Sequence, residues 1–385
     1  MENRPHIVII QNQLEDLGGV SKFCGTLASG LIDRGYQVEI GAITPPVDTP
    51  GSYYSPELST WTLVPFIAPQ RKHGLPGILS RVSFEKKLKQ FRDRVEDAAK
   101  SRFRQFDQNT IVIFTQLYAR EQISRVLPSL QDEQGFRVIG QYHNSYTAAR
   151  AWGDLGRVMR EYPNDDQFLC LTQKDAVLFQ KAGLNNSGYV LNPVQVSDNA
   201  NLAPLENKTV ISLSRYDPVK QVDHMVRAWS TISDEVPDWQ LHLYGSGPSE
   251  ESVREYIRDL GLEHSVRLMG QAPDVTSVLQ GSSISVNSSS HEGLPLALME
   301  ASALGVPSVV YDCSPGMTEI VEDGVTGFVI PEGDVTALAR GVLTLIQKPE
   351  LRKQFGKAAH QRMLDKFGIG QIIDQWEKIF YDVVR

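Results

Sequence analysis

The sequence of 385 residues has few cysteines and lacks a long apolar run. Only Cys24, Cys170 and Cys313 occur, an odd number spaced far apart, which fits reduced thiols in a core better than a disulfide framework or a zinc site. No stretch approaches the roughly 18 apolar residues that a membrane-spanning helix needs. The first apolar run starts at Ile7 and is interrupted at Gln11, too early for a secretory signal, so we expect a cytoplasmic protein.

Several common catalytic motifs are also missing. The chain has no Walker phosphate loop, no complete GxGxxG and no nucleophile elbow, which argues against a kinase, a dehydrogenase or a hydrolase. It has no low-complexity tract, and its hydrophobic (41%) and charged (22%) fractions are those of a globular protein, so the whole chain should fold. The net charge of −8 argues against general binding of nucleic acid.

The length exceeds what one hydrophobic core usually serves, and two domains are expected. Short apolar runs alternate with helix-length amphipathic stretches in both halves, which predicts an α/β protein with parallel, doubly wound sheets. The segment 192–208 is rich in Asn and Pro and poor in periodicity, so we place the domains at 1–199 and 200–366. The last segment, 367–385, is amphipathic.

The apolar runs predict eleven strands, five in the first half and six in the second. They are 6–11, 38–43, 111–114, 138–142, 168–172, 210–214, 241–244, 266–269, 284–287, 308–311 and 327–330. Open α/β sheets bind ligands outside the carboxyl ends of their strands. With the two domains facing each other at those ends, the site is expected in the cleft between them.

The segment 71–104 is strongly basic, with eleven Lys or Arg against four acids, a net charge of +7. Its apolar residues recur at helical spacing, which predicts a basic amphipathic helix. Two interpretations stay open. The helix packs its apolar side on its own domain and exposes the charges to solvent, or it forms a patch that meets an anionic membrane or an acidic polymer acceptor.

The strongest chemical signal is the run from Ser289 to Pro307, which contains Glu292, Gly293, Leu294, Pro295 and Glu300. Gly293 lets a ligand approach the backbone, Pro295 suits the first turn of a helix, and the free amides there suit a phosphate. The two carboxylates can accept hydrogen bonds from sugar hydroxyls. The alternative is an ordinary strand, turn and helix with two solvated glutamates.

This run resembles the retaining glycosyltransferases of family 4, whose hallmark is two glutamates separated by seven residues in an EGxP setting, here Glu292 and Glu300. The resemblance implies a GT-B fold, with two Rossmann-like domains facing each other across a cleft and a C-terminal helix, 367–385, that crosses back to the first domain. It also implies that Glu292 contacts the donor sugar. Gly293 and the following Leu294 and Pro295 would lie against sugar and phosphate, and Glu300 would hold the ribose hydroxyls.

The segment from Ile211 to Gln221 resembles the family's strand followed by GRL, a short gap and KG. Arg215 and Lys220 match the two cations of that pattern, whereas Ser214 and Gln221 replace the usual glycines. A leaving nucleoside diphosphate gains negative charge as the glycosidic bond breaks. Two cations directed at its phosphates would therefore stabilise the transition state more than the ground state.

Three residues of the first half complete the predicted site. Gly18 and Gly19 follow the first strand and open a helix, a placement that suits phosphate binding and resembles the family's glycine-rich loop, which faces donor phosphates and acceptor. His143 follows another strand and matches the family histidine that contacts the donor sugar. A plain turn and a structural histidine are the alternatives. The turn Tyr244–Pro248 also resembles a family element but stays outside the predicted site.

The resemblance implies transfer of a hexose or N-acetylhexosamine from a nucleotide-diphosphate sugar, with uridine as the preferred base. The acceptor would be a cell-envelope polysaccharide, a glycolipid or a polyol-phosphate polymer, and the segment 215–224 is faintly similar to enzymes that glucosylate wall teichoic acids. No Asp-x-Asp is present, so we expect no metal and no cofactor.

Two other functions stay open, a nucleotide-sugar epimerase and a catalytically silent carbohydrate-binding subunit. The expected location is the cytoplasm or the inner face of the cell membrane.

Overall fold

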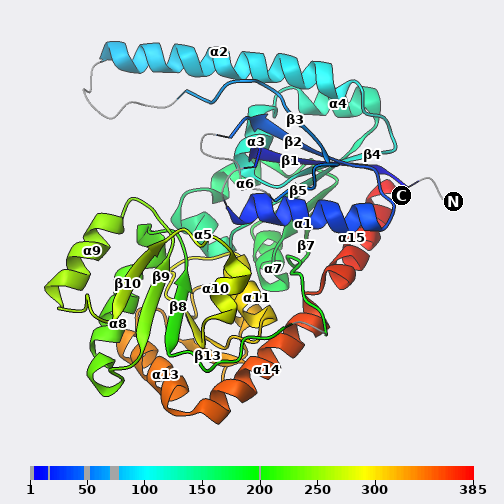
Figure 1. Cartoon of the computed structure of the whole chain (residues 1–385). Helices are drawn as coiled ribbons and strands as arrows, with labels where there is room; N and C mark the ends of the chain where they lie inside the picture. Colours follow the sequence, from blue (N-terminus) through cyan, green and yellow to red (C-terminus); the bar gives the residue numbers. More distant parts are fainter. Residues whose placement is uncertain (1–3, 16–17, 47–52, 70–77, 199–200) are drawn as a thin grey trace. The chain divides into compact units, whose positions relative to one another are not determined.

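The computed structural model describes residues 4–15, 18–46, 53–69, 78–198 and 201–385, with the side chains of 78–82 excepted (Figure 1). Its contacts divide the chain into two compact units. Unit 1 contains Met1–His143, Trp152–Val190 and Ile372–Arg385, and unit 2 contains Asn144–Ala151 and Leu191–Gln371. The boundaries that we placed at 199/200 and 366/367 remain predictions.

Unit 1 is built on a parallel sheet of seven strands in the order β3-β2-β1-β4-β5-β6-β7. The strands are β1 (His6–Gln13), β2 (Val38–Thr44), β3 (Ser59–Thr62), β4 (Thr110–Phe114), β5 (Arg137–Gln141), β6 (Gln167–Cys170) and β7 (Ser187–Tyr189). The five strands predicted for this half are confirmed, each within two residues at either end. The two edge strands, β3 and β7, were not predicted.

Helices cover both faces of this sheet, with α2 on one face and α1 on the other (Figure 1). The helices are α1 (Gly19–Asp33), α2 (Ile78–Phe103), α3 (Leu117–Gln122), α4 (Leu127–Gln134), α6 (Leu155–Glu161), α7 (Gln173–Lys181) and α15 (Ile369–Val384). Cys24 on α1 and Cys170 on β6 are buried free thiols, as expected.

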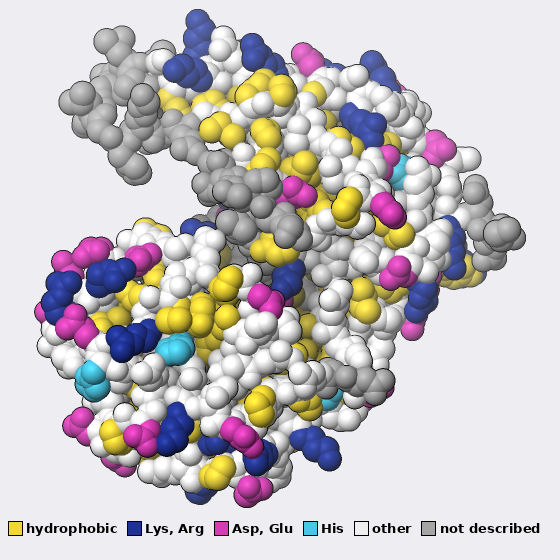
Figure 2. All heavy atoms as spheres, viewed as in Figure 1, with side chains coloured by type: hydrophobic (Ala, Val, Ile, Leu, Met, Phe, Trp, Pro, Cys, Tyr) yellow, Lys and Arg dark blue, Asp and Glu magenta, His cyan; other side chains and the backbone are white. Residues whose placement is uncertain are grey.

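The basic segment forms α2. Phe91, Val95, Ala99 and Phe103 recur every fourth residue and are buried against the sheet. This half of the helix therefore follows the first interpretation, in which the apolar side packs on its own domain. The other side is solvated, and Figure 2 shows Lys and Arg side chains along this edge of unit 1. Arg71, Lys72 and the side chain of Arg81 lie outside the described residues.

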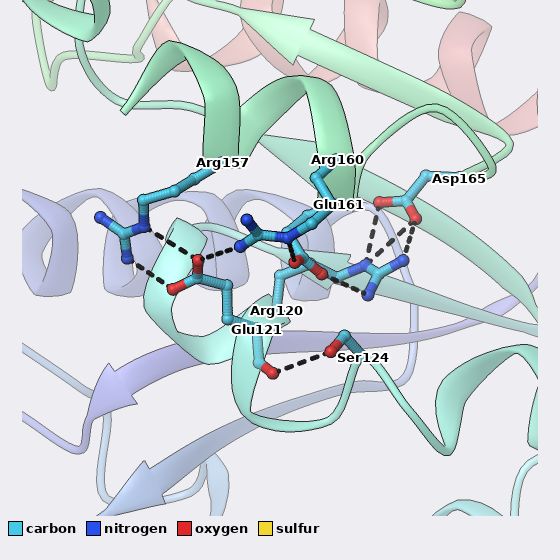
Figure 3. A network of polar contacts seen from close by, with 7 residues as sticks. All are labelled: Arg120, Glu121, Ser124, Arg157, Arg160, Glu161 and Asp165. Atoms are coloured by element: carbon cyan, nitrogen blue, oxygen red, sulfur yellow. Dashed lines mark hydrogen bonds and ion pairs between the residues drawn. The ribbon is translucent and has the colours of Figure 1, made fainter. Parts of the chain in front are cut away.

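A polar network lies between α3 and α6 (Figure 3). Arg120 is 4% exposed and donates two hydrogen bonds to Asp165 Oδ1, from Nη2 at 2.8 Å and from Nε at 3.1 Å. Glu161 lies 3.8 Å from the same guanidinium. Burial raises the pKa of Asp165 to about 6 against the opposing effect of Arg120. Glu121 beside this group binds Arg157 and Arg160 at the surface.

The last helix, α15, belongs mostly to unit 1 although it follows unit 2 in the sequence. Trp376 and Phe380 are buried, and the Phe380 ring meets Tyr36 edge-on with centroids 5.8 Å apart. Arg34 at the end of α1 bonds Asp374 at 2.7 Å and Glu377 at 3.0 Å. None of the described helices combines the length and apolarity needed to cross a bilayer.

Unit 2 contains a parallel sheet of six strands in the order β10-β9-β8-β11-β12-β13. The strands are β8 (Thr209–Leu213), β9 (Gln240–Tyr244), β10 (Val266–Gly270), β11 (Ile284–Asn287), β12 (Ser308–Tyr311) and β13 (Gly327–Ile330). All six were predicted. The chain order reverses between β8 and β11, and such a reversal opens a crevice at the carboxyl ends of the strands.

The helices of unit 2 again cover both faces. They are α5 (Tyr146–Ala151), α8 (Val222–Ser230), α9 (Glu250–Asp259), α10 (Val275–Gln280), α11 (Leu296–Ala303), α12 (Pro315–Ile320), α13 (Val335–Gln347) and α14 (Pro349–Lys366), with 3-10 turns η1 (Pro218–Lys220) and η2 (Ser233–Glu235). One core joins α8, α9 and α13 to the sheet. A second core lies under α10 and α11.

Candidate active site

The loop after β8 carries both predicted cations. Arg215 is exposed, and Lys220 closes η1 with its side chain 24% exposed. Between them, Tyr216 is buried and donates a hydrogen bond from its hydroxyl to the carbonyl of Leu243 at 2.6 Å. Tyr216 thus anchors the loop in the core and leaves the two cations on its accessible side.

The glycine turn after β9 fits closely against this loop. A Cβ at Gly245 would lie 1.9 Å from the carbonyl oxygen of Ser214, and one at Gly247 would lie 2.3 Å from that of Tyr216. Real Cβ atoms do not approach backbone that closely, so only glycine fits at either position. The turn Tyr244–Pro248, which we left outside the predicted site, therefore restricts the conformation of the loop that carries Arg215 and Lys220.

Gln221 ends the loop in the left-handed conformation, with φ 44° and ψ 47°, and is the N-cap residue of α8. Glycine adopts this conformation freely, whereas other residues are strained by about 1–2 kcal/mol. The glutamine at position 221, where the resembling pattern has glycine, thus carries a local conformational cost.

The loop after β11 forms hydrogen bonds with the loop after β8, which carries Arg215 and Lys220. The two loops are adjacent because β8 and β11 are neighbouring strands. Ser290 N–H donates to the carbonyl of Val219 at 2.8 Å. Ser288 donates from its hydroxyl to the carbonyls of Lys220 at 3.0 Å and Gln221 at 2.8 Å. These hydrogen bonds hold the two loops together at the point where the strand order of the sheet reverses.

Glu292 lies in the loop after β11 and is 8% exposed. Lys220 Nζ and Ser289 Oγ each lie 2.7 Å from its Oε1 atom, and Asn287 Nδ2 donates to the same atom at 3.3 Å. Two predicted site residues, Lys220 and Glu292, are therefore in direct contact. Asn287 and Ser289 were missed, and polar side chains at the end of a buried strand were the signal that pointed to them.

The segment after Glu292 is held from two sides. A Cβ at Gly316, at the start of α12, would lie 1.7 Å from the carbonyl oxygen of Gly293, so α12 abuts this backbone. Asn192 donates from Nδ2 to the carbonyl of Leu294 at 3.1 Å. Pro295 is the residue before α11 and not within its first turn, a difference of one residue.

Glu300 lies in the second turn of α11 and is half-buried. The amides at the start of α11 lack partners within the helix, as at any helix N-terminus, and suit an anion. Unit 2 alone thus presents two cations, a buried carboxylate and a helix N-terminus around the reversal of one sheet.

The remaining predicted residues lie in unit 1. Gly18 precedes α1 and Gly19 is its first residue, both exposed. His143 follows β5 and packs edge-on against Phe23 of α1, with ring centroids 4.5 Å apart. Its Nε2 atom is enclosed and finds no hydrogen-bond partner among the described residues. That these residues meet Glu292 across a cleft stays a prediction.

Burial lowers the pKa of His143 to about 3, so its ring is neutral at physiological pH. A neutral imidazole offers one donor and one acceptor and can bind a hydroxyl. The predicted role of His143 as a sugar contact is compatible with this state.

Comparison with known proteins places these features in a family. Residues 194–362 match the family model "Glycosyl transferases group 1". An "Uncharacterized glycosyltransferase" of Haemophilus influenzae is 33% identical over 239 residues, which are 62% of this chain and 67% of that protein. The "Poly(glycerol-phosphate) alpha-glucosyltransferase" of Bacillus subtilis is 26% identical over 241 residues, 61% of this chain but only 36% of that enzyme.

Among solved structures, a mutant of Staphylococcus aureus TarM in complex with fondaparinux, alpha-GlcNAc-glycerol and UDP superposes with a TM-score of 0.76. The alignment covers 98% of this chain and 99% of TarM at 14% sequence identity, so it shows the fold alone and confirms the GT-B class. The matched family segment contains Arg215, Lys220, Glu292 and Glu300. On the strength of that segment and of the relative covered over two thirds of its length, the chain belongs to the group 1 glycosyltransferases.

Proposed function

We propose that the protein is a retaining hexosyltransferase that uses a UDP-linked hexose or N-acetylhexosamine without a metal ion. The observation that carries this proposal is the arrangement at the β8–β11 reversal, where Lys220 and Glu292 meet beside the start of α11. The cation suits a diphosphate and the carboxylate suits sugar hydroxyls. The TarM structure contains UDP, which favours uridine as the base.

In the proposed reaction, the bond between the anomeric carbon and the diphosphate oxygen breaks while Arg215, Lys220 and the amides of α11 stabilise the departing charge. Glu292 and His143 hold the sugar, and Glu300 binds the ribose hydroxyls. The acceptor hydroxyl attacks from the face that the diphosphate leaves. Its proton passes to an oxygen of the donor phosphate, so the configuration at the anomeric carbon is retained.

For the acceptor we propose an anionic polyol-phosphate polymer of the cell envelope. The Bacillus relative is named for a poly(glycerol-phosphate) acceptor, and the TarM structure contains alpha-GlcNAc-glycerol. In this chain, Lys86, Lys87, Lys89 and Arg92 are exposed on α2, whereas its apolar residues from Phe91 onward are buried in the core. Among the described side chains of α2, these charges are exposed and the apolar residues of its second half pack in the core, which favours a polymer over a bilayer.

The donor proposal is tested by thermal shift in EDTA against UDP, GDP, ADP and their sugar conjugates. At about 100 times the Kd, one nucleotide should raise the melting temperature by about 5 °C. Lys220→Ala should abolish the shift. Lys208→Ala is the matched control, because Lys208 pairs with Asp238 on the surface of the same unit, and it should keep the shift.

Three results would contradict parts of this proposal. No shift with any nucleotide would favour the silent subunit. A shift that appears only after a divalent ion is added would refute metal independence. Interconversion of the donor sugar in the absence of any acceptor would identify an epimerase.

A further inference from the structure

The carboxylate of Glu292 is held at one oxygen only. Three donors converge on Oε1, namely Lys220 Nζ at 2.7 Å, Ser289 Oγ at 2.7 Å and Asn287 Nδ2 at 3.3 Å. Within the described part of the chain, Oε2 accepts no hydrogen bond. The two oxygens of this buried group therefore have different surroundings.

Lys220, one of the three donors, also has a role in the proposed reaction. The proposed function directs Lys220 at the donor diphosphate, and its side chain is 24% exposed and hence able to turn. If Lys220 turns toward a phosphate, Glu292 loses its counterion while it remains 92% buried. A buried carboxylate without partners is costly, so the remaining donors must satisfy it.

The other two donors are neutral and held by the backbone. Asn287 is the last residue of β11, and its Oδ1 accepts a hydrogen bond from Ser289 N–H at 2.9 Å. This bond assigns Oδ1 and so turns the Nδ2 group toward Glu292. The Ser289 hydroxyl belongs to the same short turn. Both donors thus stay in place whichever way Lys220 points.

We propose that Ser289 and Asn287 are positioning residues that hold Oε1 of Glu292, so that Oε2 faces the donor sugar and Lys220 is released to the diphosphate. The inference deepens the proposed function and depends on it. It explains why the two neutral donors lie on the same oxygen as the lysine. It also distinguishes Ser289 from the serines on either side, whose hydroxyls bond to backbone carbonyls.

The test separates binding of the nucleotide from binding of the sugar. Affinities for UDP, UDP-glucose and UDP-N-acetylglucosamine are measured by calorimetry, and slow hydrolysis of the sugar conjugates without acceptor gives kcat and KM. For Ser289→Ala we expect the Kd for UDP to stay within about twofold. The ratio of the Kd for UDP to the Kd for the sugar conjugate should fall about tenfold, and so should kcat/KM for hydrolysis. A loss of about tenfold is what removal of one hydrogen bond to a charged group is expected to cause.

Two further variants distinguish positioning from general support of the loop. Ser289→Thr keeps the hydroxyl and should restore most of the lost activity. Ser290→Ala is the matched control, because Ser290 N–H still bonds to Val219 when the hydroxyl is removed. This control should behave like the wild type.

A double-mutant cycle gives the decisive readout. If Ser289 acts through Glu292, adding Ser289→Ala to Glu292→Ala should cause no further loss. Additive losses would overturn the inference, as would wild-type values for Ser289→Ala or an equal loss of UDP affinity and thermal stability. Wild-type protein that binds UDP without any preference for a sugar conjugate would overturn it too. Wild-type protein that binds no nucleotide would instead refute the proposed function.

Discussion

His143 is a histidine whose surroundings keep its ring neutral. Its ring packs against Phe23, its Nε2 is enclosed, and burial lowers its pKa to about 3. In the unfolded chain a histidine has a pKa of about 6.5. The unfolded state therefore binds one more proton than the folded state between about pH 6.5 and pH 3, and acid favours unfolding.

We expect the wild type to lose stability as the pH falls through this window, by at most about 1.4 kcal/mol per pH unit from His143. His143→Gln should remove this part of the pH dependence. The difference in stability between variant and wild type should therefore not be the same at pH 8 as at pH 5. Urea denaturation at pH 8, 6 and 5 measures both. Parallel pH dependences for variant and wild type would show that the folded and unfolded states bind the same number of protons at His143.

At the same scale, the residue types of the site were predictable and their partners were not. Arg215, Lys220, Glu292 and Glu300 were predicted from their spacing and from the family resemblance. The contact between Lys220 and Glu292 joins residues 72 positions apart, and it depends on β8 and β11 being neighbours. Spacing along the chain contains no such information.

At the scale of elements, α3 and α6 are joined by a buried ion network (Figure 3). Removing one partner of such a network leaves an uncompensated charge, so Arg120→Ala should cost about 3–5 kcal/mol of stability. Asp165, whose pKa burial raises to about 6, is charged at high pH and neutral in acid. The cost of Arg120→Ala should thus be larger at pH 8 than at pH 5, because a protonated Asp165 needs no counterion.

Denaturant unfolding at the two pH values measures this difference. Arg160→Ala is the control, because Arg160 contacts Glu121 and Glu161 with a side chain 63% exposed and should contribute less than about 1 kcal/mol. Equal losses for Arg120→Ala and Arg160→Ala would show that burial of the network does not matter.

Two elements, β3 and β7, escaped sequence prediction for one reason. Both are edge strands, which pair on one side only and need no continuous apolar run, and unlike the edge strands β10 and β13 of unit 2 they contain none. β3 reads Ser-Thr-Trp-Thr and β7 reads Ser-Gly-Tyr, so neither contains a run of buried aliphatic residues. The central strands are buried on both faces and are therefore visible as Val- and Ile-rich runs.

At the scale of the whole molecule, the end of the chain stabilises its beginning. Trp376 is fully buried, and its helix bonds through Asp374 and Glu377 to Arg34. Trp376→Ala should cost about 3–5 kcal/mol, and the loss should fall on unit 1. Hydrogen exchange measured by mass spectrometry should rise in β1 and α1 and stay unchanged in β8 and β11.

Tyr381→Ala on the same helix is the control, since Tyr381 is 54% exposed. It should leave the exchange of both units as in the wild type. Faster exchange confined to unit 2 in Trp376→Ala would mean that α15 supports the unit that precedes it in sequence.

Local patterns were sufficient to predict the α/β class, the central strands, the two-sheet architecture and the residue types of the candidate site, because strands buried on both faces are apolar runs and an expected phosphate requires charged residues after them. Long-range packing was needed to set the edge strands β3 and β7, the hydrogen bonds between the loops after β8 and β11, and the contact of one Glu292 oxygen with Lys220, Ser289 and Asn287. These features depend on which strands become neighbours, and strand order is set by long-range packing that no local pattern records.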